Sequence, residues 1–190
     1  MKIMGPIPKK IYLACSGGSD SMFGLRFLRN SGRDVTPIYF NHQTPFGIKS
    51  QEFLESLDIG VISGTLTEQP TKGESLEAFW RNQRYAFFDQ FSDRPVITCH
   101  HMSDQIETMI MGFAHGKIRR IPGKRGNYLR PFLGVRKEEI VSYCERHGVE
   151  FVEDPSNKDM RFSRNRIRAN VIPELLKVNP GLFKSLNKLI

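Results

Sequence analysis

The strongest constraint on the fold is the alternation of short apolar runs with longer segments of helical periodicity. The runs are rich in β-branched and aromatic residues, end at turn residues, and are almost continuously apolar, as in parallel strands covered on both faces. The expected strands are 10–15, 35–40, 60–66 and 95–100, and the expected helices are 21–29, 47–57, 74–91 and 102–115. This order predicts an α/β fold with a doubly wound parallel sheet.

The chain beyond about residue 116 differs in charge and in predicted structure. Turn residues cluster near 122–126, and the expected elements beyond them are helices over 136–147, 164–177 and 181–189. Residues 1–116 carry 11 Lys and Arg against 12 Asp and Glu, whereas residues 117–170 carry 14 against 7. We therefore expect an α/β core over 1–116 and a basic, mainly helical part of the same domain over 117–190. The excess positive charge favours a polyanionic partner, and the alternative is a solvated basic surface.

The composition narrows the class of protein. No apolar run approaches the ~18 residues that a membrane span requires, and the first ten residues contain no apolar segment of a secretory signal. The three cysteines, Cys15, Cys99 and Cys144, form no CxxC pair, which argues against a disulfide framework and against a zinc or iron–sulfur site. We therefore expect a cytoplasmic protein without a membrane partner.

The stretch SGGSDS at 16–21 directly follows the first expected strand and precedes the first expected helix. In a doubly wound sheet, ligands bind beyond the carboxyl ends of the strands. Two glycines let the backbone approach a ligand closely, and the free N–H groups at a helix start favour an anion such as phosphate. The carboxylate of Asp20 would repel an anion at this position unless a cation binds between them, and Mg²⁺ on nucleotide phosphates is the expected cation. The alternative is a flexible glycine–serine turn, since the loop matches neither GxxxxGK[ST] nor GxGxxG.

The same stretch resembles the pyrophosphate-loop (PP-loop) signature of ATP pyrophosphatases, which cleave ATP to AMP and pyrophosphate while they adenylate a substrate. Four further stretches occur in the order typical of the tRNA(Ile)-lysidine synthase family: EAFWRNQRY at 77–85, HHMSDQIET at 100–108, LRPFLGVRKEEI at 129–140 and EDPSNKDMRFSRNRIRANVIPEL at 153–175. The resemblance covers about residues 10–180. It implies a catalytic core of the adenine-nucleotide α-hydrolase type with a helical C-terminal extension.

The resemblance also implies a reaction and its partners. Family members use ATP and Mg²⁺ to adenylate C2 of the wobble cytidine in a tRNA anticodon loop, and the amine of lysine then displaces AMP. The family's further C-terminal tRNA-binding domains are expected to be absent from this chain. Without those domains, tRNA selection would come from residues 117–170, from the partner in a homodimer, or from another protein.

Residue roles follow from the positions that match the family's motifs. Ser16, Gly17, Gly18, Ser19, Asp20 and Ser21, with Arg81 and Arg84, are expected to bind ATP, and Asp20 is also the expected metal contact. Asp20, Asp104 and Glu107 are the expected catalytic residues. Because Asp104 and Glu107 are spaced i,i+3, they share a helix face and could take up the lysine ammonium; the alternative is that they are favourable acids at a helix start. His100, His101, Arg164, Asn165 and Arg168 are expected to contact the tRNA.

The sequence departs from the family at two positions, which keeps other functions open. Ser103 stands where the family usually has an aspartate, and the segment after Asn41-His42 is shorter than in the family. The rival enzymes are a tRNA-thiolating relative, for which the cysteines do not form the usual pairs, and an enzyme that adenylates another tRNA base or a small carbonyl or carboxylate compound. A nucleotide- or RNA-binding module that has lost catalysis is the alternative outside enzymes. Trp80 is expected in the core.

Overall fold

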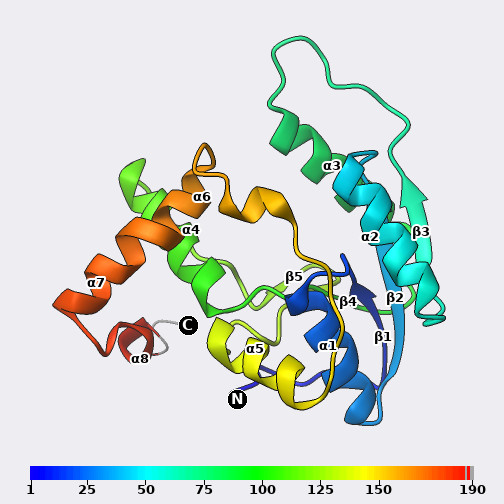
Figure 1. Ribbon diagram of the computed structural model, residues 1–190, viewed down its shortest axis with the longest axis horizontal. Helices are drawn as coiled ribbons and strands as arrows, with labels where there is room; N and C mark the ends of the chain where they lie inside the picture. The colour runs from blue at the N-terminus through cyan, green and yellow to red at the C-terminus, as the bar shows by residue number, and fades with distance from the viewer. Residues whose placement is uncertain (187, 189–190) are drawn as a thin grey trace.

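A six-stranded sheet forms the centre of the computed structural model, which describes residues 1–186 and 188 (Figure 1). The strands are β1 (Lys10–Ala14), β2 (Asp34–Asn41), β3 (Ile62–Thr65), β4 (Val96–Ile97), β5 (Lys124–Arg125) and β6 (Tyr128–Leu129). They lie in the order β3-β2-β1-β4-β6-β5, and every neighbouring pair is parallel except β5 with β6. The four predicted strands are present, although the one expected over 95–100 is reduced to Val96–Ile97. The sequence did not predict β5 and β6, because Lys124-Arg125 and Tyr128-Leu129 do not belong to an apolar run.

Helices cover both faces of the sheet, which confirms the doubly wound α/β class. Side chains alternate along β1, so Ile11 and Leu13 enter one apolar cluster while Tyr12 enters another. The first cluster contains side chains of α1 (Ser19–Asn30), α2 (Pro45–Ser56) and α5 (Lys137–Arg146). The second contains side chains of α3 (Leu76–Phe88), which therefore packs on the opposite face. The sheet is buried on both sides, as its continuous apolar runs predicted.

A third apolar cluster joins the C-terminal helices to α4 (Met102–Ala114) at one side of the sheet (Figure 1). Met102 and Ile106 of α4 pack against Ile167 and Ile172. The latter two belong to a continuous helical stretch made of α6 (Ser163–Arg166), a π-helical turn (Ile167–Val171) and α7 (Ile172–Val178). A single α-helix over 164–177 was predicted, and that prediction missed the π turn. Pro173 explains it, because proline has no N–H to donate and its ring crowds the carbonyl one turn earlier.

The change in charge near residue 117 does not coincide with an end of the sheet. β5 and β6 lie beyond it and complete the sheet, and α5 packs against α1. The predicted helix over 181–189 is present as α8 (Leu182–Leu186), and residues 187 and 189 lie outside the described part of the chain. A short 3₁₀ turn, Pro155–Lys158, precedes α6.

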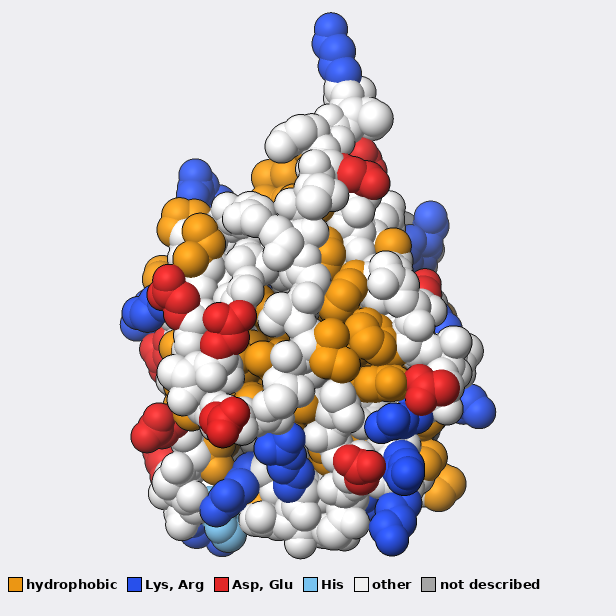
Figure 2. All heavy atoms as spheres, turned by 90° about the vertical axis from the view of Figure 1, so that its right-hand side faces the viewer, with side chains coloured by type: hydrophobic (Ala, Val, Ile, Leu, Met, Phe, Trp, Pro, Cys, Tyr) orange, Lys and Arg blue, Asp and Glu red, His pale blue; other side chains and the backbone are white. Residues whose placement is uncertain are grey.

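The face of the molecule that carries α2 and β3 presents hydrophobic side chains near its centre with charges of both signs around them (Figure 2). The loop that joins β3 to α3 extends upward beyond the top of the molecule in both Figure 1 and Figure 2. Trp80 is partly exposed at this side and stacks on His42 with ring centroids 5.5 Å apart, so its placement in the core was wrong. Among the described residues, no helix combines the length and the apolarity needed to cross a bilayer.

Candidate active site

The strand order creates a topological switch point at the carboxyl ends of β1 and β4, and we call this edge of the sheet the crevice. The chain runs outward from β1 to β2 and β3 and then returns to β4 on the other side of β1. The loops that follow β1 and β4 therefore leave in opposite directions, and such a switch point is where doubly wound sheets bind ligands. The SGGSDS stretch follows β1, and His100 and His101 follow β4, so the structure brings these two motifs to one edge.

The backbone of the SGGSDS loop is held in a defined shape. Gly17 has a φ of +78°, which a side chain would strain, and its carbonyl accepts a hydrogen bond from the N–H of Val152 at 2.9 Å. The Ser21 hydroxyl donates to the Gly18 carbonyl at 2.9 Å and accepts from the Ser16 N–H at 3.1 Å. Ser21 is buried and braces the loop, whereas Ser16 is exposed. The loop is therefore a preformed turn, not the flexible glycine–serine segment that was the alternative.

The loop delivers the chain into the N-terminus of α1, which begins two residues earlier than predicted. Gly18 is the N-cap residue and no side chain caps the helix. Ser19 and Asp20 lie in the first turn, so the first backbone N–H groups and the positive end of the helix dipole are available to an anion. Lys137 at the start of α5 reaches this turn and donates to the Ser19 hydroxyl at 2.8 Å.

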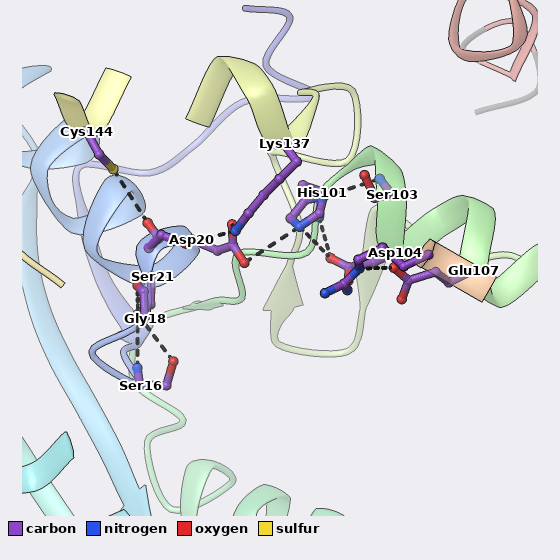
Figure 3. A network of polar contacts seen from close by, with 12 residues as sticks. Ser16, Gly18, Asp20, Ser21, His101, Ser103, Asp104, Glu107, Lys137 and Cys144 are labelled. Atoms are coloured by element: carbon purple, nitrogen blue, oxygen red, sulfur yellow. Dashed lines mark hydrogen bonds and ion pairs between the residues drawn. The ribbon is translucent and has the colours of Figure 1, made fainter. Parts of the chain in front are cut away.

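Asp20 lies between the side chains of Lys137 and His101 (Figure 3). Its Oδ1 accepts from Nζ of Lys137 at 2.5 Å, and its Oδ2 lies 3.6 Å from Nε2 of His101. Burial alone would raise the pKa of Asp20, but the hydrogen bond and charge of His101 and the charge of Lys137 lower it to about 2. Asp20 is therefore fully ionised at neutral pH. The sequence patterns did not identify Lys137 as a site residue, although it lies inside the 129–140 motif.

His101 and Asp104 close the start of α4 with a capping box. The backbone N–H of His101 donates to Oδ2 of Asp104 at 2.8 Å, and the N–H of Ser103 donates to Nδ1 of His101 at 3.2 Å. The Nε2 of His101 therefore carries the ring proton and lies 3.7 Å from Oδ2 of Asp104. Burial lowers the pKa of His101, but Asp104 and Asp20 outweigh it and the pKa is raised. Here Asp104 makes the helix-capping contact that was the alternative to its catalytic role.

Glu107 is 1% exposed and faces the C-terminal helices. Its Oε1 accepts from Nε of Arg168 at 2.8 Å, and its Oε2 is buried without a hydrogen-bond partner among the described residues. Burial raises the pKa of Glu107, and the hydrogen bond and charge of Arg168 oppose that rise only in part. Arg168 thus pairs with a residue of the site, in addition to any contact it makes with a partner.

A group of arginines surrounds His100. Arg81 and Arg164 are exposed and Arg84 is partly buried, while Arg130, which follows β6, is only 3% exposed. Burial lowers the pKa of His100 to about 4; the positive charges of Arg130, Arg81 and Arg164 act in the same direction, and Asp104 opposes them. His100 is therefore neutral at physiological pH, and its Nδ1 lies 2.9 Å from the Thr98 hydroxyl. This wall of the crevice is suited to an anion.

Asn165 has a different position from the other predicted tRNA contacts. Its side-chain amide donates to the carbonyls of Ser156 at 2.7 Å and Asp159 at 2.9 Å, and so holds the 3₁₀ turn against α6. Arg161 pairs with Asp159 at 2.7 Å ahead of the helix. The structure therefore gives Asn165 a role in shaping the segment, which its sequence position did not reveal.

The donor set at Asp20 suits Mg²⁺ that arrives with phosphates. Within residues 1–186 and 188, no three His, Cys, Asp or Glu side chains are grouped as a metal cage. Mg²⁺ usually keeps several waters and binds through one or two carboxylates plus substrate phosphates. Asp20 is ionised and stands beside the α1 N-terminus, so it could supply such a carboxylate.

Comparison with known proteins finds relatives along almost the whole chain. A protein from Francisella tularensis that is named tRNA(Ile)-lysidine synthase is 32% identical over 95% of this chain and 50% of its own length. A protein of the same name from Geobacter sulfurreducens is 39% identical over 90% of this chain and 41% of its own length. The chain thus spans about half the length of the curated relatives it matches.

A solved structure, described as a predicted subunit of a tRNA methyltransferase from Methanocaldococcus jannaschii, overlaps 73% of this chain and 76% of that one with 13% identity and a TM-score of 0.48. The PP-loop domain family matches residues 3–175. This match spans the SGGSDS loop, the crevice between β1 and β4 and most of the C-terminal helices. The chain therefore belongs to the PP-loop domain family.

Proposed function

We propose that this chain uses ATP to activate a base of tRNA, and that it then joins lysine to C2 of the wobble cytidine. The proposal is supported by the name that the relatives share and by the PP-loop family membership. The observation that carries it is the meeting of an uncapped helix N-terminus, the Asp20–Lys137 pair and the buried Glu107 carboxylate at one edge of the sheet.

In the first step, the C2 oxygen of the cytidine attacks the α-phosphorus of ATP, and the bond from that phosphorus to pyrophosphate breaks. The leaving pyrophosphate gains negative charge. The first N–H groups of α1 and the ammonium of Lys137 can stabilise this charge without reorganising. Mg²⁺, bound by Asp20 and the phosphates, would add positive charge at the same place.

In the second step, the lysine amine forms a bond to C2, and the C2–O bond breaks so that AMP leaves with the oxygen. The amine must first lose a proton, and the ordinary pKa of a lysine side chain, about 10.4, lies ~3.4 units above neutral pH, or roughly 4.6 kcal/mol. The partnerless Oε2 of Glu107 is an acceptor for the ammonium, and Asp104 lies one helical turn earlier on the same face. We assign amine binding to these two carboxylates.

The test is to incubate the protein with ATP, labelled lysine and unmodified tRNA, then to digest the RNA to nucleosides. We expect a lysine-containing cytidine and stoichiometric AMP and pyrophosphate. Lys137→Met should lower turnover about a hundredfold or more, since loss of one preorganised charge stabiliser typically costs that much. Asp20→Asn should be equally impaired. Asp34→Asn, which changes an exposed carboxylate at the start of β2, is the matched control and should retain full activity.

The same assay separates the alternatives. If pyrophosphate release requires another RNA base or a small carboxylate, the proposed acceptor is wrong and the proposed reaction of ATP stands. RNA and ATP binding without pyrophosphate release would identify a binding module, the alternative that Ser103 in place of the family's aspartate leaves open. Normal turnover by Lys137→Met would remove the role given to the Lys137 ammonium.

A further inference from the structure

A rigid cationic surface lies beside the crevice, on the segment between α4 and β6. Lys117, Arg119 and Lys124 are exposed and make no ion pair or side-chain hydrogen bond with any residue that the structure describes. The sequence contains no Asp or Glu between Glu107 and Glu138. We call the segment 117–125 the basic platform. The ATP chemistry proposed for the crevice uses no residue of this platform.

Buried polar groups hold the platform in place. The N–H of Ile121 donates to Oε1 of Gln105 at 2.7 Å, and Gln105 is 1% exposed. Arg130, 3% exposed, donates from Nη1 to the Pro122 carbonyl at 2.9 Å, and its N–H donates to the Gly123 carbonyl at 2.8 Å. Three consecutive platform residues are therefore anchored from the protein interior. A surface that is fixed before binding loses less conformational entropy when a partner arrives.

The platform continues into the wall of the crevice. Lys124 pairs in register with Leu129, the last residue of β6, so the platform lies at the same carboxyl edge as the SGGSDS loop. The guanidinium of Arg125 lies 5.1 Å from the centre of the Tyr85 ring, and that of Arg81 lies 4.8 Å from the same ring. Arg81 is one of the cations that surround His100. Arg125 and Arg81, on the same tyrosine ring, thus extend the positive charge of the platform toward the crevice.

Exposed apolar side chains accompany these charges. Phe113 at the end of α4 is 84% exposed, and Ile118 within the platform is 95% exposed. The turn between them is closed by a bond from the Lys117 N–H to the Gly112 carbonyl at 2.8 Å. A polyanion with unstacked bases fits this combination, because cations hold its phosphates and apolar side chains contact its bases. An anionic membrane surface would also bind these positive charges, but it would not explain why they extend toward the crevice.

We propose that the basic platform binds the RNA backbone outside the anticodon and so guides the target base to the crevice. This inference rests on the proposed function, because the RNA is the substrate named there. It assigns RNA contacts to residues 117–125, in addition to the two histidines of the crevice and the C-terminal residues that the motifs indicated. Arg125 at the end of the platform shares the Tyr85 ring with Arg81, which links the platform to the arginines near His100.

The test is a triple variant, Lys117→Gln, Arg119→Gln and Lys124→Gln, studied by equilibrium binding to unmodified tRNA without ATP or lysine. Each phosphate contact contributes about 0.7–0.9 to the slope of log K against log salt. We expect the slope to fall by about 2–3 and the affinity at 0.1 M salt to drop at least tenfold. The matched control, Lys9→Gln, Arg26→Gln and Lys49→Gln, removes the same charge from exposed positions elsewhere and should change both quantities little.

The outcomes separate this inference from the proposed function. ATP binding and the melting temperature, measured on both variants, should equal those of the wild type and show that the fold is intact. If the wild type binds tRNA and both triple variants bind equally well, the platform is not the RNA surface, while the proposed function stands. If the wild type fails to bind tRNA at low salt, both proposals fall. Binding to vesicles of anionic phospholipid that only the platform variant loses, with unchanged tRNA affinity, would overturn the inference in favour of a membrane.

Discussion

Replacement of Arg168 by methionine tests whether the Glu107 carboxylate is held as a buried charge. Arg168→Met keeps most of the side-chain length but leaves Oε1 of Glu107 without its partner at 2.8 Å, next to Oε2, which already has none. Glu107 is 1% exposed and cannot turn to water in the folded protein without a change in packing. In the variant, the Glu107 carboxylate must therefore take up a proton. If it stays charged, it destabilises the fold.

The expected cost follows from the burial of the two partners. Removal of one partner from a fully buried ion pair typically costs about 3–5 kcal/mol. Because the Arg168 side chain is 44% exposed, water can replace part of the lost interaction, and we expect about 1–3 kcal/mol at pH 7.5. For a chain of this size, about 2 kcal/mol lowers the melting temperature by roughly 4–8 °C.

The pH dependence has a definite sign. The pKa of Glu107 in the folded protein is already raised by burial, and loss of Arg168 raises it further. The folded state then binds a proton more tightly than the unfolded state does, so the associated stability is present below the unfolded pKa and is lost as pH rises through the folded pKa. The free-energy difference between variant and wild type should therefore be small near pH 4.5 and grow toward pH 8.

The assay is denaturant unfolding of wild type, Arg168→Met, Glu107→Gln with Arg168→Met, and Arg164→Met at several pH values. The double variant should recover much of the loss because it has no buried charge. Arg164→Met, which removes an exposed arginine from the same stretch of helix, should change the free energy of unfolding by less than about 0.5 kcal/mol. A cost for Arg168→Met that is equal at pH 5 and pH 8, or a double variant no more stable than the single one, would refute the reasoning.

Two further predictions concern the walls of the crevice. A Cβ at Gly24 would lie 2.4 Å from Sγ of Cys99, so Gly24→Ala should lower the free energy of unfolding by about 1–3 kcal/mol in denaturant unfolding. Gly123→Ala is the control and should be nearly neutral, because no atom lies within 4 Å of a Cβ at that position. The additional substitution Cys99→Ala should restore the stability that Gly24→Ala loses. Failure of that rescue would show that the sulfur is not the obstacle. The adjacent histidines should titrate apart in NMR, His100 with a pKa of about 4 and His101 with a pKa above its usual value. The fold should therefore lose stability as pH falls from 6.5 toward 4, because His100 takes up a proton in the unfolded chain but not in the folded protein. Equal pKa values near 6.5 would contradict the described burial and charges.

Much of the fold and part of the site follow from local patterns. The four long apolar runs became β1 to β4 because a run of that composition is stable only when both of its faces are covered. The position of SGGSDS between a strand and a helix placed the loop correctly. The two short strands β5 and β6 escaped prediction because their pairing depends on neighbours far along the chain: Val96 pairs with Tyr128.

The contacts between the motifs depend on the tertiary structure. Lys137 lies more than a hundred positions from Asp20 in sequence, and only the packing of α5 on α1 brings its ammonium to 2.5 Å from the carboxylate. Arg168 reaches Glu107 because the π turn and α7 pack on α4. Neither pair leaves a periodic signal, since side-chain partners across elements are chosen by geometry and not by spacing.

The sequence by itself determined the class of the sheet, the place of the SGGSDS loop and the basic character of the C-terminal part, because apolar periodicity, glycine content and charge act locally. The tertiary structure alone decided which cation faces Asp20, that Ser21 braces the loop, that Asn165 holds a turn, and that the 117–125 segment is anchored from within. Each of these features depends on contacts between buried groups of segments that are far apart in the sequence. The free energy of such a contact depends on both segments and cannot be read from either one alone.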